Sequence, residues 1–563
     1  MKAILLTTII CFVLLLSTTA QTDQELVYAS YFGGEGFEIV YDIAIDFQGN
    51  IYLAGFTNSE TGISTEGAYQ EEYNGGNGDG FIAKFDSDYN LLWSTYFGGE
   101  NFEWILGISV LTDGSFIITG NTNSEFDIAT MGAYQEDYGG GEDAFLSKFS
   151  AEGVLVWSTY FGGNDNDVGN SLVIVNDSIY FAGRARSAGM ATSGAFQEVQ
   201  AGSNDGFIAS FSSSGELFWS TYYGGPSSDF FNEINITDQN ELVLLGRTQS
   251  ETNIATTNVY QETYNGGIDC FITKFTLAGE RVWGTYYGGP GIEQAYGIDS
   301  DNSGNIIVSG YTGSSTGIAT PGAHKTTKEF VDDFLASFTP DGQINWGTYV
   351  GGERGESDGN GVFLKDSDIY FTGRTDSENG IVTGSPYQVE YAGPYEPEFF
   401  NSDIYLTKFN SSGQQLWGTY YGSSGFDYVE KMIMIDNNTV ALAGYTNSTE
   451  GVTTPDALND ELNGFADGLL AVFDVDLLTG IIELDKPALQ VFPNPASGYF
   501  IINLPSTIAA NGLVEIYSLE GKRMMVFENY SSGNRIPIDL SPGMYVVNYR
   551  VGELKLRAKL LVQ

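Results

Sequence analysis

The chain has 563 residues, of which 72 are Asp or Glu and 23 are Lys or Arg, so its formal net charge at pH 7 is −49. Such an acidic surface argues against nucleic acid and anionic lipid as partners, because contact with phosphate needs Lys and Arg to displace counterions. Aromatic residues make up 14% of the chain, which is ample material for a large core.

The chain begins with a pattern typical of a secretory signal peptide. Lys2 precedes an apolar run over residues 4–16, and small polar residues follow before Gln21. We therefore expect residues 1–20 to be a signal peptide. No later run approaches the ~20 apolar residues that a membrane helix needs, so we expect no transmembrane segment and export of the mature chain. Cys270 is then the single remaining cysteine, and its repeat position favours a packed thiol.

The tetrapeptide Tyr-Phe/Tyr-Gly-Gly, with small variations, recurs along most of the chain. Its tyrosines are Tyr31, Tyr96, Tyr160, Tyr222, Tyr286, Tyr349 and Tyr420, at steps of 62 to 71 residues. A fixed internal period of this size predicts a propeller, a solenoid or an array of repeats.

Each repeat contains four short runs with the composition of β-strands. In the first repeat these are residues 41–46, 51–55, 81–85 and 91–97, and a long polar segment separates the second run from the third. Four antiparallel strands about every 64 residues describe one blade of a β-propeller. The sequence predicts an all-β fold with a seven-bladed propeller over residues 21–480.

The two ends of the repeat region complement each other. The last repeat ends with residues 469–473 and lacks an outer strand, whereas residues 26–32 match an outer strand, with Tyr28 where other repeats have Trp. We therefore expect the two ends to pair within one blade. Such pairing removes exposed strand edges that would promote aggregation.

Residues 484–563 differ in composition from the repeats. From residue 486 onward they carry eight Lys or Arg and five Asp or Glu, and short alternating runs are separated by Asn-Gly, Glu-Gly and Pro-Gly turns. This pattern predicts a small β-sandwich domain.

Both regions resemble known families. Asp-x-Phe-Ile-x-Lys-Phe, Trp-Ser-Thr-Tyr-Phe-Gly-Gly, Gly-Asn-Ile-Tyr and Gly-x-Thr-x-Ser recur in order over residues 25–475, which resembles the SBBP family of bacterial β-propeller repeats. The segments 491–498, 514–522, 540–546 and 559–563 resemble the Por secretion tail, the C-terminal sorting domain of type IX secretion in Bacteroidetes. The resemblance implies recognition by the type IX secretion machinery, and a protein that is secreted or attached to the outer cell surface.

An acidic residue precedes the first strand of every blade. These acids are Glu38, Glu103, Asp167, Asp229, Glu293, Glu356 and Asp427. A ring of carboxylates near the axis could hold a cation such as calcium, the one cofactor that the sequence suggests. The favoured alternative is that each acid accepts hydrogen bonds from backbone N–H groups or from recurrent serines: Ser59, Ser124, Ser187, Ser250, Ser314, Ser377 and Ser448.

Departures from the repeat are the better candidates for a ligand site. The variable position of Gly-x-Thr is Arg184, Arg247 or Arg374 in three blades. These arginines could bind a carboxylate or sulfate of a glycan or peptide, or they could neutralise acids in interblade ion pairs. His324, the single histidine, takes a position held by tyrosine in other blades, so no histidine-based triad or multi-histidine metal site can be built.

The sequence therefore favours a scaffold that binds an extracellular protein or glycan on the propeller face that carries the long segments between second and third strands. An extracellular carbohydrate-active enzyme, a hydrolase or lyase using acids on this loop-bearing face, is the first alternative. A cation-stabilised structural surface protein is the second. No residue is assigned a catalytic role.

Overall fold

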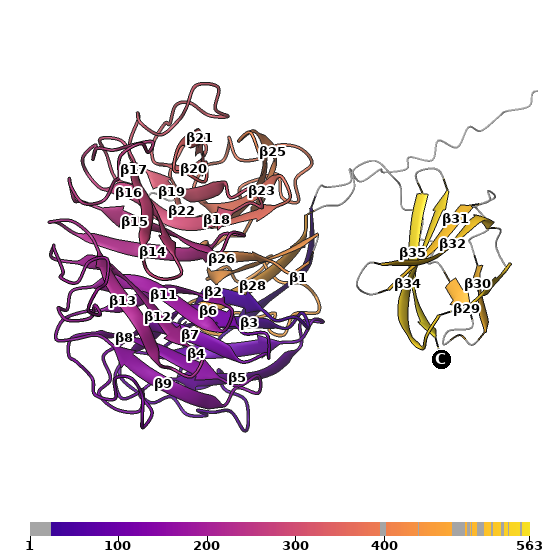
Figure 1. Ribbon diagram of the computed structural model, residues 1–563, viewed down its shortest axis with the longest axis horizontal. Coiled ribbons are helices and arrows are strands. Elements are labelled where there is room, and N and C mark those ends of the chain that lie inside the picture. Colours follow the sequence, from indigo (N-terminus) through magenta and orange to yellow (C-terminus); the bar gives the residue numbers. More distant parts are fainter. Residues whose placement is uncertain are drawn as a thin grey trace, which may run out of the picture. The chain divides into compact units, whose positions relative to one another are not determined.

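The structure is a computed structural model that describes residues 24–393, 401–436 and 438–475 and, with gaps, residues 490–562. The predicted signal peptide lies outside the described residues. The chain divides into two compact units, residues 1–477 and 478–563. All elements of the described residues are β-strands (Figure 1), and no helix there is long and apolar enough to cross a membrane.

The described part of the first unit forms seven four-stranded antiparallel sheets, which are the blades of a propeller. In blades 1 to 6 the first strand in chain order is the inner one, which packs against the inner strands of the neighbouring blades. Blades 1 to 3 contain β2 (Glu38–Ile45), β3 (Ile51–Thr57), β4 (Asp79–Phe85) and β5 (Leu91–Phe97); β6 (Glu103–Val110), β7 (Phe116–Thr122), β8 (Asp143–Phe149) and β9 (Leu155–Phe161); and β10 (Val168–Val175), β11 (Ser178–Ala185), β12 (Asp205–Ser212) and β13 (Leu217–Tyr223).

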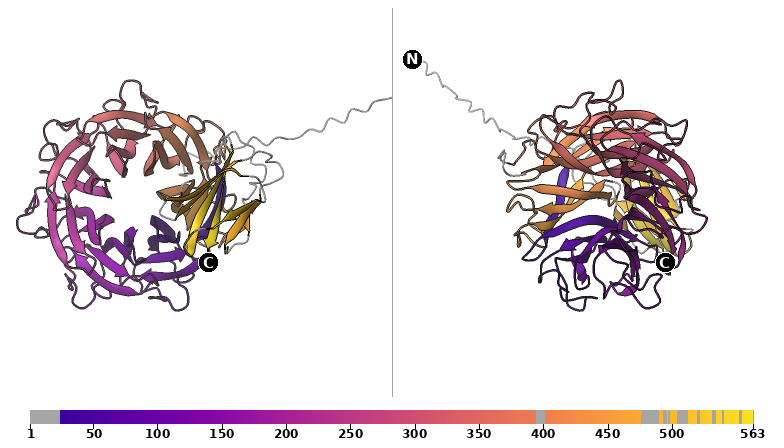
Figure 2. Two further views of the ribbon diagram at one scale, coloured as in Figure 1. Left: turned by 45° about the vertical axis from the view of Figure 1, so that its right-hand side comes forward. Right: turned by 90° about the vertical axis from the view of Figure 1, so that its left-hand side faces the viewer.

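Blades 4 to 6 repeat the same order. They contain β14 (Asp229–Ile236), β15 (Glu241–Thr248), β16 (Asp269–Thr276) and β17 (Arg281–Tyr287); β18 (Glu293–Ser300), β19 (Ile306–Thr312), β20 (Asp332–Phe338) and β21 (Ile344–Val350); and β22 (Glu356–Lys365), β23 (Asp368–Thr375), β24 (Asp403–Asn410) and β25 (Gln415–Tyr421). Figure 2 (left) shows the blades following one another around a common centre.

Blade 7 is built from both ends of the repeat region. It contains β26 (Asp427–Met434), β27 (Thr439–Thr446) and β28 (Asp467–Asp474), and β1 (Glu25–Phe32) completes it by pairing antiparallel with β28. Ala29 lies opposite Ala471, and Tyr31 opposite Leu469. The prediction that the two ends share one blade is confirmed.

The recurrent tryptophan of the outer strand joins neighbouring blades. The indole N–H of Trp157 donates to the carbonyl of Ser213 in the next blade (3.1 Å), and Trp219, Trp283 and Trp346 make equivalent bonds. Each of these rings packs under a turn glycine of the next blade, such as Gly215. Blade 7 has Tyr28 in the tryptophan position, and blade 1 has Tyr89 in the glycine position; their rings stack at 4.7 Å.

Six of the seven inner strands carry a one-residue β-bulge at the same place. In β2, Val40 and Asp42 pair with consecutive residues of β3, so Tyr41 between them has no partner in the ladder. The corresponding extra residues of β6, β10, β14, β18 and β26 are Leu106, Asn170, Asn232, Tyr296 and Glu430. A bulge redirects a side chain away from the regular alternation, and here it turns six side chains toward the centre of the propeller.

The second unit contains two sheets. One has the order β29 (Gln490–Phe492), β30 (Tyr499–Asn503), β33 (Arg535–Pro537), and the other β32 (Arg523–Tyr530), β31 (Gly512–Ser518), β34 (Gly543–Val551), β35 (Leu554–Val562). Phe500 and Ile536 of the first sheet share a buried cluster with Val514 and Val547 of the second. Two sheets around one core form a small β-sandwich, as the sequence predicts.

Candidate binding site in the central cavity

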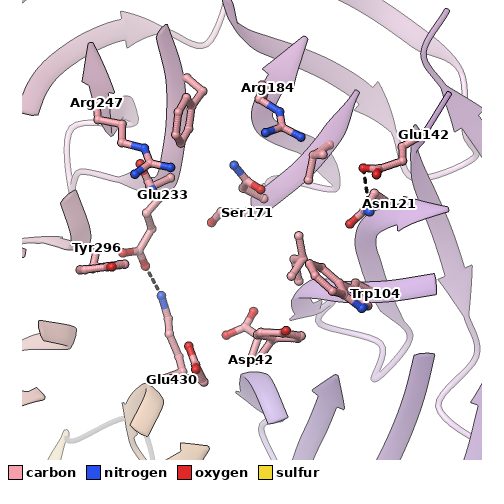
Figure 3. Close-up of a pocket in the computed structure, with 17 residues that line it drawn as sticks. Asp42, Trp104, Asn121, Glu142, Ser171, Arg184, Glu233, Arg247, Tyr296 and Glu430 are labelled. Carbon is pink, nitrogen blue, oxygen red and sulfur yellow. Dashed lines mark hydrogen bonds and ion pairs between the residues drawn. The ribbon is translucent and has the colours of Figure 1, made fainter. Parts of the chain in front are cut away.

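The inner strands enclose a cavity of ≈390 Å³ at the centre of the propeller, here called the central cavity. All six bulge residues named above line it (Figure 3). Glu142, from the long segment between β7 and β8, lines it as well, which places the cavity toward the loop-bearing face. Its volume falls in the range of about 300–1,000 Å³ found for small-molecule sites.

Two arginines of adjacent blades form one side of the central cavity. The guanidinium of Arg247 lies 4.1 Å from the ring centre of Phe230 and donates from Nη1 to Gln294. Arg184 forms no hydrogen bond or ion pair with any described residue, although it is half-buried. Burial, with a smaller effect from the charge of Arg184, lowers the pKa of Arg247. The predicted arginine position thus brings two cations together at the cavity wall.

Four carboxylates line the cavity as well. Figure 3 shows Asp42 and Glu430 across the cavity from the two arginines, whereas Glu233 lies beside Arg247 and Glu142 beside Asn121. Lys431 of blade 7 reaches across to form an ion pair with Glu233 of blade 4. Burial alone would lower the pKa of Lys431, but Glu233 and Asp42 raise it above its ordinary value. Burial raises the pKa of Asp42 to about 6, although Lys431 acts against this. The positive charge of Lys431 is therefore balanced by Glu233 and Asp42.

Amide side chains supply further polar groups. Asn121 takes the same position as Arg184 and Arg247 in blade 2, and its side chain is 2% exposed. Its Nδ2 donates to Glu142 (3.3 Å), whereas its Oδ1 has no hydrogen-bond partner among the described residues. The Oδ1 of Asn232 is likewise buried without a partner. A buried acceptor without a partner costs about 1–3 kcal/mol, so these amides mark places where a ligand or water completes the site.

Aromatic side chains form a set of ring contacts on blades 7, 1 and 2, here called the aromatic arc, and one of them, Trp104, lines the cavity. Its members are Phe37, Phe56, Phe102, Trp104, Phe426, Tyr428, Tyr445 and Phe465. Phe37 packs against Tyr445 at 5.6 Å, and Trp104 packs against Phe56 at 6.1 Å. Trp104 is 39% exposed and lines the cavity, and Phe465 is 71% exposed. Blades 3 and 4 have Asn166 and Ser228 in the position of Phe102. The aromatic arc therefore breaks the sevenfold symmetry of the propeller.

The seven predicted ring acids do not line the cavity. Each is at most 1% exposed and accepts hydrogen bonds within its own blade. Glu38 accepts from Thr57 Oγ1 (2.6 Å), from Ser59 Oγ and from the N–H of Gly34 (3.0 Å). The other blades repeat this pattern, except that Ala185 replaces the threonine in blade 3, where the N–H groups of residues 186 and 187 donate instead.

The tyrosine that marks the repeat belongs to the same network. The hydroxyl of Tyr96 donates to the carbonyl of Ser59 (2.9 Å), the serine whose side chain binds Glu38. In blade 7 the equivalent tyrosine is Tyr31 of β1, which donates to Ser448. Acid, serine and tyrosine thus form one clamp in every blade. In the described residues no three His, Cys, Asp or Glu side chains gather closely enough to hold a metal ion, and the cation ring stays a prediction.

A second set of buried acids lies at the start of each third strand. Asp79 accepts from Gln70 Nε2 (3.0 Å) and the N–H of Asn74 (2.9 Å), while its Oδ1 has no partner in the described structure. Burial, with the nearby charge of Glu103, raises the pKa of Asp79 to about 7. Burial likewise raises the pKa of Asp143, Asp269 and Asp403 to about 7.

These acids should make stability depend on pH. A carboxyl whose pKa is higher in the folded chain than in the unfolded chain binds its proton more tightly when folded, so its contribution is complete below about pH 4 and is lost as the pH rises through about 7. We expect Asp79→Asn to make the fall in the free energy of unfolding between pH 5 and 6 shallower by about 1.4 kcal/mol per pH unit, the effect of one proton. Urea unfolding at a series of pH values measures this slope.

The matched control is Asp88→Asn, because Asp88 is an exposed acid in the turn after the same strand. It should leave the pH slope of the parent protein unchanged. An Asp79→Asn slope identical to that of the parent would show that this carboxyl is already ionised at pH 5.

Two further predicted site residues lie outside the cavity lining. The guanidinium of Arg374 stands 4.2 Å from the ring centre of Tyr428, beside the aromatic arc. His324 packs its ring edge-on against Phe409 of the next blade at 5.7 Å, just as Tyr69 packs against Phe149. His324 therefore takes the place of an aromatic ring that packs against the next blade. Cys270 is fully buried, and burial raises the pKa of its thiol well above the ordinary value.

Sequence reasoning missed the bulge residues and most of the aromatic arc. The bulge residues follow the ring acid by three positions, and they vary from blade to blade as Tyr41, Leu106, Asn170, Asn232, Tyr296 and Glu430. The residues on either side of them vary as well, so the sequence holds no signal that sets the bulge residues apart.

Seven four-stranded blades around a central cavity define a β-propeller, joined in the chain to a β-sandwich. Residues 27–61 match the family model of the SBBP β-propeller repeat, and residues 490–563 match that of the secretion system C-terminal sorting domain. The chain is therefore a propeller protein that is exported by type IX secretion and is secreted or attached to the cell surface.

More distant similarities link the chain to three other proteins. The regulatory protein FlaEY of Caulobacter vibrioides is 22% identical over 300 residues, which is 49% of this chain and 30% of that protein. The WD40 domain of Neurospora crassa Pan2 is 10% identical, with a TM-score of 0.40 over 80% of this chain and 95% of that one. A PL25 ulvan lyase is 11% identical, with a TM-score of 0.41 over 74% of this chain and 92% of that one.

Proposed function

We infer that the protein is an extracellular binding propeller whose central cavity captures a ligand, a glycan or a protein segment, from outside the cell. The observation that carries this proposal is Arg184. It lies in the wall of a cavity, in a chain with 72 acidic residues, and yet no described acid pairs with it. Arg184 and the buried amide oxygens of Asn121 and Asn232 are polar groups without a partner among the described residues. Such groups support a site in which a ligand supplies the missing hydrogen bonds.

The hydrogen bonds and ion pairs that the acidic side chains already form favour binding over catalysis. The ring acids are consumed by hydroxyl and N–H groups of their own blades, and Glu233 is paired with Lys431. His324 lies outside the cavity lining, in an aromatic contact. No pair of carboxylates is singled out as a general acid and a general base.

The test fills the cavity and measures binding. We expect Leu106→Trp to abolish capture of ligands from an array of glycans and defined peptides, because the larger side chain occupies the space between the inner strands. The control is Val156→Trp, which places the same residue at a 55% exposed position of the outer strand β9. Bound ligands are then incubated with the protein and examined for products.

Binding that survives Leu106→Trp would place the ligand elsewhere and overturn the proposal. Turnover of a bound polysaccharide or peptide, lost on one acid-to-amide substitution in the cavity, would assign the site to an enzyme.

A further inference from the structure

We propose that the central cavity binds an acidic saccharide, with a uronate carboxylate or a sulfate ester held by Arg184 and Arg247 and a sugar ring stacked on Trp104. This inference rests on the proposed function and names its ligand class. It draws on three independent features of the cavity: the arginine pair, the amides and the exposed tryptophan.

The arginine pair is arranged to receive an anion. The stack on Phe230 and the bond to Gln294 fix Arg247, while Arg184 in the adjacent blade has no partner among the described residues. Guanidinium groups bind carboxylate and sulfate through two parallel N–H groups, and they do so most strongly where water is largely excluded. Both Nε atoms are buried without a hydrogen-bond partner. Since no described residue pairs with Arg184, an anionic group of a ligand can neutralise it.

The remainder of the wall suits hydroxyl groups. Asn121 and Asn232 each leave a buried amide oxygen without a partner, and the carboxylates of Asp42 and Glu430 face the arginines across the cavity. Amides and carboxylates accept hydrogen bonds from hydroxyl groups. A molecule with an acid at one end and hydroxyls at the other matches this polarity.

Trp104 supplies a flat apolar surface beside these polar groups. Its ring is held by Phe56 at 6.1 Å, Phe102 at 5.8 Å and Tyr41 at 6.0 Å, and it remains 39% exposed. An aromatic ring fixed by its neighbours loses little conformational freedom when a ligand stacks on it. The C–H face of a pyranose ring is a partner for this flat ring, and the hydroxyl groups of the same sugar can bond the amides.

A peptide is the less favoured ligand. Peptides often bind by adding a strand to a free sheet edge, whereas the groups that mark this cavity are side chains: two guanidinium groups, amide groups and an indole ring. A peptide C-terminus could still reach the arginines, so a defined peptide forms one arm of the test.

The experiment measures binding by calorimetry to the mature full-length protein. The probes are a galacturonic acid tetrasaccharide, a sulfated galactose tetrasaccharide, an uncharged galactose tetrasaccharide and a set of C-terminal peptides. We expect at least one acidic probe to bind more than tenfold more tightly than the uncharged one. Arg184→Gln should weaken the acidic probe about 10- to 100-fold, as loss of a charged hydrogen bond does, and Arg184→Lys should weaken it less. Trp104→Ala should weaken acidic and uncharged probes alike.

Arg281→Gln is the matched control. Arg281 also stacks on an aromatic ring, that of Phe196 at 4.8 Å, but it lies on the outer strand β17 and does not line the cavity. It should leave binding unchanged, and melting temperatures of all variants identify any that fail to fold. If a variant fails to fold, the same contact is tested on the parent protein instead: free galacturonate is added, and it should compete with the acidic tetrasaccharide for binding.

The outcomes separate the two proposals. If no acidic probe binds, or if the uncharged probe binds equally, the saccharide inference fails; binding of a peptide that Leu106→Trp abolishes would then leave the proposed function standing. If no probe of either class responds to Leu106→Trp, both proposals fail.

Discussion

Removal of residues 25–32 is expected to unfold blade 7 and to make the protein aggregate. This deletion takes away β1, whose residues Tyr31 and Ala29 are fully buried and whose backbone pairs with β28 along its length. An unpaired β28 would present a row of free N–H and C=O groups beside an exposed core, a template for association with other chains. Size-exclusion chromatography and thermal unfolding of the purified protein measure the effect.

Single substitutions within β1 separate burial from strand removal. We expect Tyr31→Ala to lower the free energy of unfolding by about 3–5 kcal/mol, the usual cost of truncating a buried aromatic residue, because its ring is buried and its hydroxyl donates to Ser448. Val27→Ala, at a 43% exposed position of the same strand, should change it by less than about 0.5 kcal/mol. A deletion variant that melts at the parent temperature would contradict the role given to β1.

Truncation of the sorting domain should have an equally large effect, on location. Deleting residues 540–563 removes β34 and β35, and β34 is a central strand of its sheet. The buried side chains Val547 and Leu560 are lost from the sandwich core. We expect the truncated protein to accumulate in the periplasm instead of reaching the cell surface or medium. Immunoblots of periplasmic, surface and medium fractions measure this distribution.

A pair of substitutions in the same sheet tests the fold of the sorting domain. Val547→Asp places a charge in the core, which is costly without a partner, and should retain the protein in the periplasm. Met524→Asp, at a 41% exposed position of β32, should be exported normally. In both retained variants the propeller should keep the protease resistance of the parent, since it is a separate compact unit. Normal export of the truncated chain would refute the sorting role.

Most of the fold could be predicted because the residues that recur in the sequence are the ones that hold each blade together. Tyr31, Tyr96 and their equivalents recur because each completes a clamp with a serine and an acid. Tyr28 in a tryptophan position correctly indicated that the first strand completes the last blade, although its complement, Tyr89 in a glycine position, was not noticed.

The site was only partly predictable. Arg184 and Arg247 could be found because cations are rare in this chain, and both line the cavity. His324 attracted attention as the single histidine, yet its ring only fills a packing position. Tyr41 and Leu106 turn inward because each is the extra residue of a β-bulge. The alternation of apolar and polar residues in the sequence does not reveal where a strand holds such an extra residue.

The bulges also make this propeller suited to redesign of its specificity. Each bulge residue stands outside the hydrogen-bonded ladder of its blade, and the six come from six different inner strands. Asn170 is tied to the neighbouring blade by its bond to the carbonyl of Phe231, but Leu106 has no such polar tie. A combinatorial library that varies these positions would change the lining of the central cavity while the clamps and tryptophan contacts between blades stay as they are, so new binding proteins could be selected from one stable framework.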